Sequence, residues 1–215
     1  MKNKLISKIK SREAIVGIIG LGYVGLPQLI SFSKEGFKTF GFDIDQSKVK
    51  KLNNGQSYIN HISAEKISAA VKNGFTATTD FRQISIVDVI LICVPTPLLV
   101  HNKPDLSFII NSLGSIKPHL KENQLIVLES TSYPGTTEEE VAPVIKDNGF
   151  EIGKNFFLGF SPEREDPGNT KFSIKTIPKV VSGYSEKCLE LTKALYEKII
   201  EKTVPVSSLR VAEMT

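Results

Sequence analysis

The feature that most constrains the fold is a glycine pattern between a predicted strand and a predicted helix. The apolar run 14–19 is followed by Gly20-Leu21-Gly22-Tyr23-Val24-Gly25, and a segment of helical periodicity begins at Tyr23. This order is typical of Rossmann-type folds, in which the first glycine permits a tight turn and the second lets the backbone approach a pyrophosphate. The third glycine lets the helix pack close to the strand. The segment therefore predicts the start of a dinucleotide-binding domain.

The rest of the chain repeats this alternation of strand and helix. We predict strands at 14–19, 39–42, 75–78, 87–94, 125–128, 156–160 and 179–182, and helices at 23–35, 47–53, 64–73, 106–116, 137–147 and 186–201. Most of the strand runs are continuously apolar, which indicates burial on both faces. We therefore expect an α/β protein with a Rossmann-type, doubly wound, mainly parallel sheet and helices on both of its faces.

Several helix ends carry their own signals. Gly36, Gly74 and Gly149 fall where a left-handed residue would end a helix. Thr137 and Glu140 have the spacing of a capping box, so they predict a helix start.

The last residues predict a helix that has only begun. Ser208 is placed as its N-cap, and no C-terminal signal follows before Thr215. We therefore divide the chain into a dinucleotide-binding domain at 1–206 and the start of a further helix at 207–215. This ending suggests a fragment of a longer protein.

The second predicted strand ends in an acidic residue that bears on the choice of cofactor. Asp43 follows Gly20 at nearly the spacing at which a carboxylate hydrogen-bonds the ribose hydroxyls of adenosine. The same carboxylate would repel a 2′-phosphate, so NAD is predicted over NADP. Lys48 complicates this choice, because a cation near Asp43 could make the 2′-phosphate of NADP tolerable. Alternatively, Lys48 is a solvated lysine of the helix with no role in cofactor binding.

A proline-rich loop, Val94-Pro95-Thr96-Pro97, follows the fourth strand at the sheet edge where such folds bind ligands. Val94, Pro95 and Thr96 are therefore candidates for cofactor contact. The Thr96 hydroxyl could donate to a ribose, or Thr96 could be an ordinary turn residue.

Composition narrows the class of protein. The formal net charge of +4 comes partly from the lysines that precede the first apolar run, which we interpret as a solvated arm, since a nucleic-acid surface needs a larger basic patch. No apolar run approaches the roughly 20 residues of a membrane span, and the N-terminus lacks a signal-peptide core. A cytoplasmic protein without nucleic-acid or membrane partners is expected. Cys93 and Cys188 show no metal-type spacing, and Cys93 is predicted to be a buried hydrophobe.

Two polar loops follow the fifth and sixth predicted strands. Taken alone, the hydroxyl-rich loop 129–137 would be a helix cap and the charged loop 160–169 would be a solvated loop. Both follow the carboxyl ends of strands, so both are expected to face the cofactor.

Taken together, these motifs resemble those of the UDP-glucose/GDP-mannose dehydrogenase family. The similarity runs in order from Glu13 to Thr215 and rests on residues 20–27, 42–45, 94–97, 129–131, 134–137, 161–164 and 212–214. Residues 57–62 and 161–169 look most like the UDP-N-acetylglucosamine 6-dehydrogenase branch.

The resemblance implies a four-electron oxidation of the C6 alcohol of a UDP-sugar to a carboxylate, with two NAD and a thioester on a cysteine of a later domain. It places Thr131 and Glu163 near the nicotinamide and the reacting carbon, as catalytic and cofactor-binding residues. It places Glu163, Arg164 and Glu165 beside the sugar nucleotide, and His61 could also touch the substrate. No metal is implied, and the full-length protein is expected to be a homodimer.

In one respect the chain departs from the family pattern. The family's catalytic lysine, asparagine and cysteine would come after Thr215, so the chain is predicted to bind NAD but to be inactive alone. The alternatives are a UDP-glucose or UDP-N-acetylmannosamine 6-dehydrogenase, a β-hydroxyacid dehydrogenase of the 6-phosphogluconate type, and a non-catalytic NAD-sensing module. The loop 161–163 argues against the β-hydroxyacid dehydrogenase.

Overall fold

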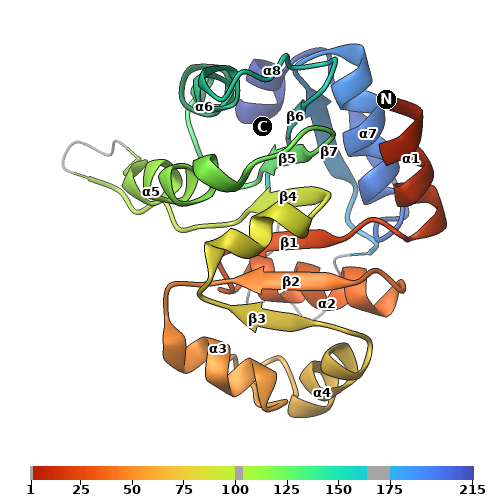
Figure 1. The fold of residues 1–215 in the computed structure, drawn as a ribbon, viewed down its shortest axis with the longest axis vertical. Helices are drawn as coiled ribbons and strands as arrows, with labels where there is room; N and C mark the ends of the chain where they lie inside the picture. Colours follow the sequence, from red (N-terminus) through yellow and green to blue (C-terminus); the bar gives the residue numbers. More distant parts are fainter. Residues whose placement is uncertain (1, 100–103, 164–174) are drawn as a thin grey trace.

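The computed structural model of the chain describes residues 2–99, 104–163 and 175–215 (Figure 1). Its α-helices are α1 (Lys2–Ser11), α2 (Gly25–Lys34), α3 (Gln46–Asn53), α4 (Ala64–Lys72), α5 (Ser107–Ile116), α6 (Ala142–Asp147), α7 (Glu186–Tyr196) and α8 (Leu209–Glu213). Its strands are β1 (Val16–Ile19), β2 (Thr39–Phe42), β3 (Thr76–Thr78), β4 (Val89–Ile92), β5 (Leu125–Leu128), β6 (Phe157–Phe160), β7 (Lys179–Gly183) and β8 (Thr203–Pro205).

The strands of the described residues form one 8-stranded sheet in the order β3-β2-β1-β4-β5-β6-β7-β8. The strands from β3 to β6 are parallel, β7 runs antiparallel to β6, and β8 is parallel to β7. The chain order reverses between β1 and β4, which makes this the point where ligands bind in doubly wound sheets. The predicted Rossmann-type, mainly parallel sheet is confirmed.

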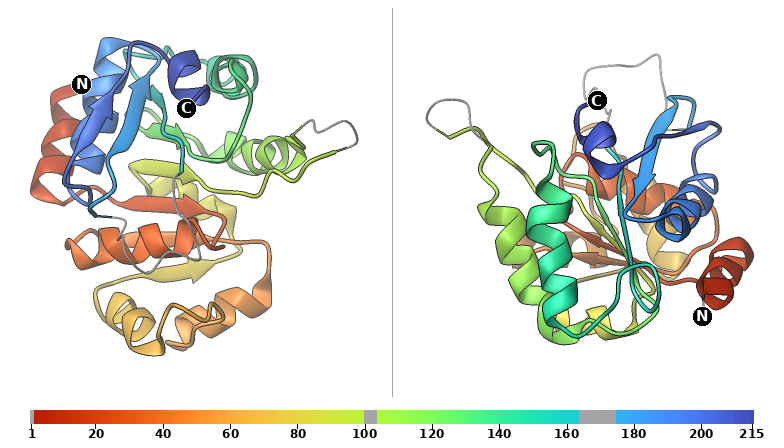
Figure 2. Two further views of the ribbon diagram at one scale, coloured as in Figure 1. Left: turned by 180° about the vertical axis from the view of Figure 1, so that it is seen from behind. Right: turned by 90° about the horizontal axis from the view of Figure 1, so that it is seen from above.

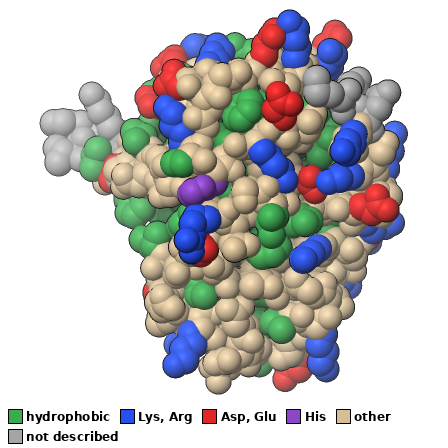
Figure 3. All heavy atoms as spheres, viewed as in Figure 1, with side chains coloured by type: hydrophobic (Ala, Val, Ile, Leu, Met, Phe, Trp, Pro, Cys, Tyr) green, Lys and Arg blue, Asp and Glu red, His purple; other side chains and the backbone are tan. Residues whose placement is uncertain are grey.

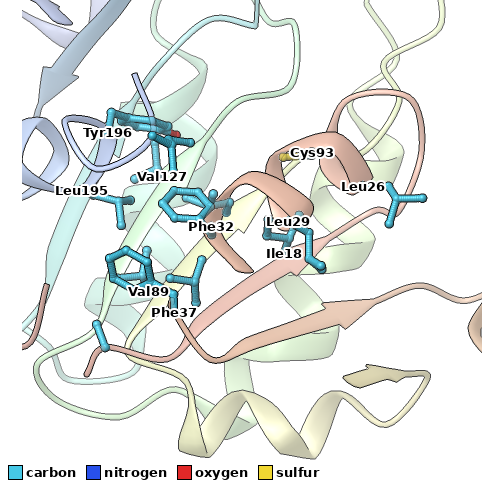
Figure 4. Packing of buried hydrophobic residues seen from close by; sticks show 14 of the residues in the cluster. Ile18, Leu26, Leu29, Phe32, Phe37, Val89, Cys93, Val127, Leu195 and Tyr196 are labelled. Atoms are coloured by element: carbon cyan, nitrogen blue, oxygen red, sulfur yellow. The ribbon is translucent and has the colours of Figure 1, made fainter. Parts of the chain in front are cut away.

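Helices cover both faces of the sheet (Figure 2), and a hydrophobic core lies against each face. One core joins the sheet to α1, α2, α3, α4 and α7, and Figure 4 shows part of it, including Phe32, Val89 and Leu195. The other joins the opposite face to α5, α6 and α8. Strands β1, β2, β4, β5 and β6 are buried at every position, as the continuously apolar runs predicted.

The sequence had suggested that the basic N-terminal segment is a solvated arm, and this prediction is wrong. It forms α1, which packs against α7 and buries Leu5 and Ile9 in the first core. Lys8 lies on the same helix and pairs with Asp88 at 2.8 Å. The apolar spacing of Leu5 and Ile9 places both on one helix face, and burial of that face stabilises the helix despite the surrounding lysines.

Other boundaries also differ from the sequence predictions. The predicted helix 186–201 ends at Tyr196, and the three-residue strand β8 was not predicted. The predicted helix 137–147 begins with a π-helical turn over Thr137–Val141. Gly36, Gly74 and Gly149 have φ values of 90°, 91° and 81°, which confirms the predicted left-handed positions.

Candidate cofactor site and buried charge cluster

The glycine turn between β1 and α2 has the geometry of a phosphate-binding loop. Gly20 has a φ of 92°, and a Cβ there would lie 2.6 Å from the Cys93 carbonyl oxygen. A Cβ on Gly25 would collide with the Gly20 carbonyl oxygen, whereas one on Gly22 would have nothing within 4 Å. The N-cap residue of α2, Val24, supplies no side-chain hydrogen bond. The open space at Gly22 and the start of α2 therefore suit an anion such as a pyrophosphate.

The acidic residue after β2 is tied to this turn. Asp43 is buried, and its Oδ2 accepts a hydrogen bond from the Leu21 backbone amide at 3.0 Å. Its Oδ1 accepts from the Asp45 amide at 3.0 Å, and Lys48 Nζ lies 3.5 Å from Oδ2. The carboxylate is therefore fixed at the carboxyl edge of the sheet beside the glycine turn, where it would meet a ribose. Lys48 contacts Asp43, so it is more than a solvated helix residue.

Residues 57–62 fold back over the glycine turn. The Tyr58 hydroxyl donates to the Leu21 carbonyl, and the Tyr23 and His61 rings stack with centroids 5.9 Å apart. Lys48 Nζ lies 5.8 Å from the centre of the Tyr58 ring. Burial, together with the negative charge of Asp43, raises the pKa of Tyr58, so its hydroxyl stays protonated and can donate. His61 is exposed and touches the cofactor turn through Tyr23.

The loops after β4 and β5 are joined by a hydrogen bond. Ser130 Oγ donates to the Val94 carbonyl oxygen at 2.8 Å. Pro95 and Thr131 are exposed, and Thr96 is half-buried. Because β4 and β5 are adjacent and parallel, these residues lie at the same sheet edge as the glycine turn.

A cluster of buried charged groups lies at this edge. Lys179 Nζ is 2.9 Å from Glu129 Oε2 and 3.2 Å from Glu163 Oε2. Gln28 Nε2, on α2, is 2.5 Å from both of these oxygens, and the Tyr196 hydroxyl donates to Glu129 Oε1 at 2.5 Å. The Glu129 side chain is 0% exposed, that of Lys179 is 8% and that of Glu163 is 17%. Gln28, Glu129, Glu163, Lys179 and Tyr196 are called the charge cluster below.

Burial and mutual attraction shift the ionisation of the charge cluster. Burial raises the pKa of the Glu129 carboxyl, although the Lys179 ammonium opposes this. Burial alone would lower the pKa of Lys179, but Glu129 and Glu163 outweigh it and raise that pKa. Burial, followed by the Glu129 charge, also raises the pKa of the Tyr196 phenol well above its usual value. Cys93 is buried, as predicted, and burial raises the pKa of its thiol well above the usual range.

The raised pKa of Tyr196 predicts a pH dependence of stability. Above the usual tyrosine value of 10.0, the unfolded chain releases this proton while the folded chain keeps it, so stability falls as pH rises. Each such proton contributes about 1.4 kcal/mol per pH unit. Above about pH 10, we expect the free energy of unfolding, measured with urea, to fall more steeply with pH in the wild type than in Tyr196→Phe. The two slopes should differ by this amount. Parallel stability curves for the two proteins would contradict the assignment.

A second contact holds the loop that follows Thr131. Glu213, on α8, accepts hydrogen bonds from the Gly135 amide at 2.5 Å, the Thr137 amide at 2.8 Å and the Thr137 hydroxyl at 2.6 Å. The predicted capping box of Thr137 and Glu140 is therefore wrong. A carboxylate distant in sequence caps this helix start, and the Thr137 hydroxyl donates to it.

Removing this cap should loosen the loop. We expect Glu213→Ala to increase amide hydrogen exchange at Gly135 and Thr137 by roughly tenfold to a hundredfold, because a hydrogen bond to a charged group contributes about 1.5–3 kcal/mol. Glu138→Ala is the matched control. Glu138 makes a partly exposed ion pair with Arg210, which lies on α8 like Glu213. Equal exchange rates in the two variants would show that Glu213 does not hold the loop.

The structure brings most of the predicted site residues to one sheet edge. The glycine turn, Asp43, Lys48 and the residues after β4, β5 and β6 all lie at the carboxyl ends of the parallel strands. Arg164 and Glu165 lie outside the described residues. Within the described chain, no group of three or more His, Cys, Asp or Glu side chains is arranged to hold a metal.

The sequence interpretation gave no site role to four members of the charge cluster, namely Gln28, Glu129, Lys179 and Tyr196, although Glu129 belongs to the motif 129–131 that carries the family resemblance. The sequence did carry a signal. Glu129 and Lys179 directly adjoin the apolar runs of β5 and β7, and a charged residue at that position in a buried strand is unusual unless it is paired.

On the face shown in Figure 3, lysine and arginine side chains are interspersed with aspartate and glutamate. In the described part of the chain, no helix is both long and apolar enough to cross a membrane.

Comparison with known proteins agrees with this geometry. Residues 14–200 match the UDP-glucose/GDP-mannose dehydrogenase family, NAD binding domain. The chain is 38% identical to Protein CapL of Staphylococcus aureus over 200 residues, covering 92% of this chain and 46% of CapL. It is 37% identical to the UDP-N-acetyl-D-glucosamine 6-dehydrogenase of Pseudomonas aeruginosa over 204 residues, covering 94% and 48%.

A solved structure shows the same fold. The native structure of the UDP-N-acetyl-mannosamine dehydrogenase Cap5O from Staphylococcus aureus superposes with a TM-score of 0.87 at 33% identity, covering 94% of this chain and 49% of that one. The chain thus spans about half the length of the relatives it matches.

The matched region, together with the geometry of the sheet and the glycine turn, defines an NAD-binding Rossmann domain of an oxidoreductase family. The chain belongs to the UDP-glucose/GDP-mannose dehydrogenase family. The predictions of family and of NAD as cofactor are confirmed.

Proposed function

We propose that this chain is the NAD-binding part of a nucleotide-sugar 6-dehydrogenase that oxidises the C6 alcohol of UDP-N-acetylglucosamine to the uronic acid. The relative named for UDP-N-acetylglucosamine is 37% identical, and the structure named for UDP-N-acetylmannosamine is 33% identical. These names support a UDP-N-acetylhexosamine. The observation that carries the proposal is that Glu163 and the NAD-binding turn share one sheet edge.

The residues present fit NAD. The open space at Gly22 and the amino end of α2 would receive the pyrophosphate, and Asp43 would accept the ribose hydroxyls. Bound NAD supplies a hydride acceptor. We assign the adenosine end to the side of β2 and the nicotinamide end to the side of β5 and β6, because the ligand crosses the sheet edge at the switch point.

The chain's own polar residues would then act at the nicotinamide end. We propose that Thr131 orients the cofactor or a water molecule, and that Glu163 exchanges a proton with the substrate or with water. Glu163 suits this role because its carboxylate is partly buried yet still 17% exposed. Arg164 and Glu165 are proposed to contact the sugar nucleotide, and residues 207–215 to begin a helix that connects to the substrate-binding part.

The test is NADH formation by a polypeptide in which residues 1–215 are continued by a second half of the kind that the relatives have. We expect two NADH per UDP-N-acetylglucosamine and a lower kcat/KM with UDP-N-acetylmannosamine or UDP-glucose. Glu163→Gln should lower kcat by roughly a hundredfold or more while NAD still binds. A preference for UDP-N-acetylmannosamine would overturn the substrate assignment. NAD binding without reduction by any UDP-sugar would favour a sensing module.

A further inference from the structure

The antiparallel strand β7 brings a lysine to the edge where the parallel strands end. Gly159 pairs with Gly183 and Phe160 with Ser182, so continuing this register places residue 179 opposite residue 163. A parallel β7 would have begun at the other edge of the sheet. Lys179 therefore lies beside Glu163 because of the reversed direction of this strand, and Nζ is 3.2 Å from Glu163 Oε2.

Within the charge cluster, Glu129 is the fixed member. It is fully buried and bonded to Gln28, Lys179 and Tyr196, which come from α2, β7 and α7. Glu163 contacts the same Gln28 nitrogen and the same Lys179 ammonium, but part of its side chain reaches the surface. Glu129 thus fixes the two donors in place, and these donors hold the exposed carboxylate.

The orientation of Gln28 supports this division of roles. Its Nε2 faces both carboxylates, while its buried Oε1 has no hydrogen-bond partner among the described residues. Turning the amide over would place an oxygen against two carboxylates. Leaving the amide oxygen unpaired is unfavourable, but the two hydrogen bonds to charged carboxylates offset this because they are stronger than hydrogen bonds between neutral groups.

We infer that Lys179 is a positioning residue that keeps the Glu163 carboxylate ionised and directed toward the cofactor edge of the sheet. This inference rests on the proposed function in one respect, namely that Glu163 works at the reacting carbon. A lysine that served only to stabilise the fold would need Glu129 alone. The second contact, to Glu163, is what the positioning role requires.

The experiment measures the proton affinity of Glu163 in the 215-residue chain by carbon NMR of its side-chain carboxyl. Two variants are compared. In Glu129→Gln, Lys179 keeps its contacts with the Pro162 carbonyl oxygen and with Glu163, which becomes its only carboxylate partner among the described residues. The double variant Glu129→Gln/Lys179→Met removes the ammonium without leaving a second buried carboxylate. Folding of each variant is checked by the amide spectrum of the sheet. We expect the double variant to bind the proton at Glu163 at least about tenfold more tightly than Glu129→Gln.

Lys179→Arg in the Glu129→Gln background should restore most of this difference, because it returns the positive charge. If the two main variants are folded and their Glu163 proton affinities agree within about twofold, the positioning role of Lys179 is wrong. NAD affinity is measured on the same samples. If the wild type binds no NAD, the proposed function is contradicted. If the Glu163 titration is the same in the two variants, only the positioning role of Lys179 is contradicted.

Discussion

Lys179→Met should lower the free energy of unfolding by about 3–5 kcal/mol, because it leaves the buried Glu129 carboxylate without its cation. Glu129 is fully enclosed, so water cannot replace the lost ammonium. Urea denaturation of the wild type and the variant near neutral pH measures the effect.

The matched control is Glu129→Gln/Lys179→Met, which removes both buried charges. We expect its stability to lie within about 2 kcal/mol of the wild type, since an apolar or neutral replacement of a buried pair is often nearly neutral. If the single and double variants were equally destabilised, lost packing around the Lys179 side chain would be the cause and the unpaired charge would not.

Gly25→Ala is the second substitution with a large expected effect. The new Cβ would collide with the Gly20 carbonyl oxygen, so the glycine turn or the start of α2 must move. Overpacking of this kind costs about 1–3 kcal/mol, and moving a strained turn adds a similar amount. We expect the free energy of unfolding to fall by about 3 kcal/mol and the NAD affinity to fall by roughly a hundredfold.

Gly114→Ala is the control for the chemical change itself. Gly114 is exposed in the last turn of α5, and a Cβ there meets nothing within 4 Å. This variant should gain about 0.5–1 kcal/mol and bind NAD unchanged. Normal NAD binding by Gly25→Ala would show that the close approach of α2 to the turn is not required.

The local patterns predicted the part of the fold that binds the cofactor. The apolar run before Gly20, the glycine spacing and Asp43 after β2 each carry their meaning within a few residues, so strand, turn, helix and carboxylate could be placed without tertiary information. The comparisons support the family that these motifs resemble.

The parts that were missed depend on contacts between distant residues. Nothing in the apolar run of β7 reveals its direction, so the meeting of Lys179 with Glu163 was not predictable. Glu213 replaced the expected capping box from a position near the end of the chain. Helix α1 forms because its apolar face packs against α7. The local charge pattern could not indicate this contact.

The central claim is that this chain binds NAD at the glycine turn with Asp43 on the adenosine ribose. Calorimetric titration of the 215-residue chain with NAD and with NADP, in the wild type and in Asp43→Asn, tests it most directly. We expect the wild type to bind NAD and to discriminate against NADP. The variant should lose roughly tenfold in NAD affinity, because charged hydrogen bonds to the ribose are weakened, and should lose most of the discrimination. A folded wild type that binds no NAD, or an Asp43→Asn variant with unchanged affinity and selectivity, would contradict the account.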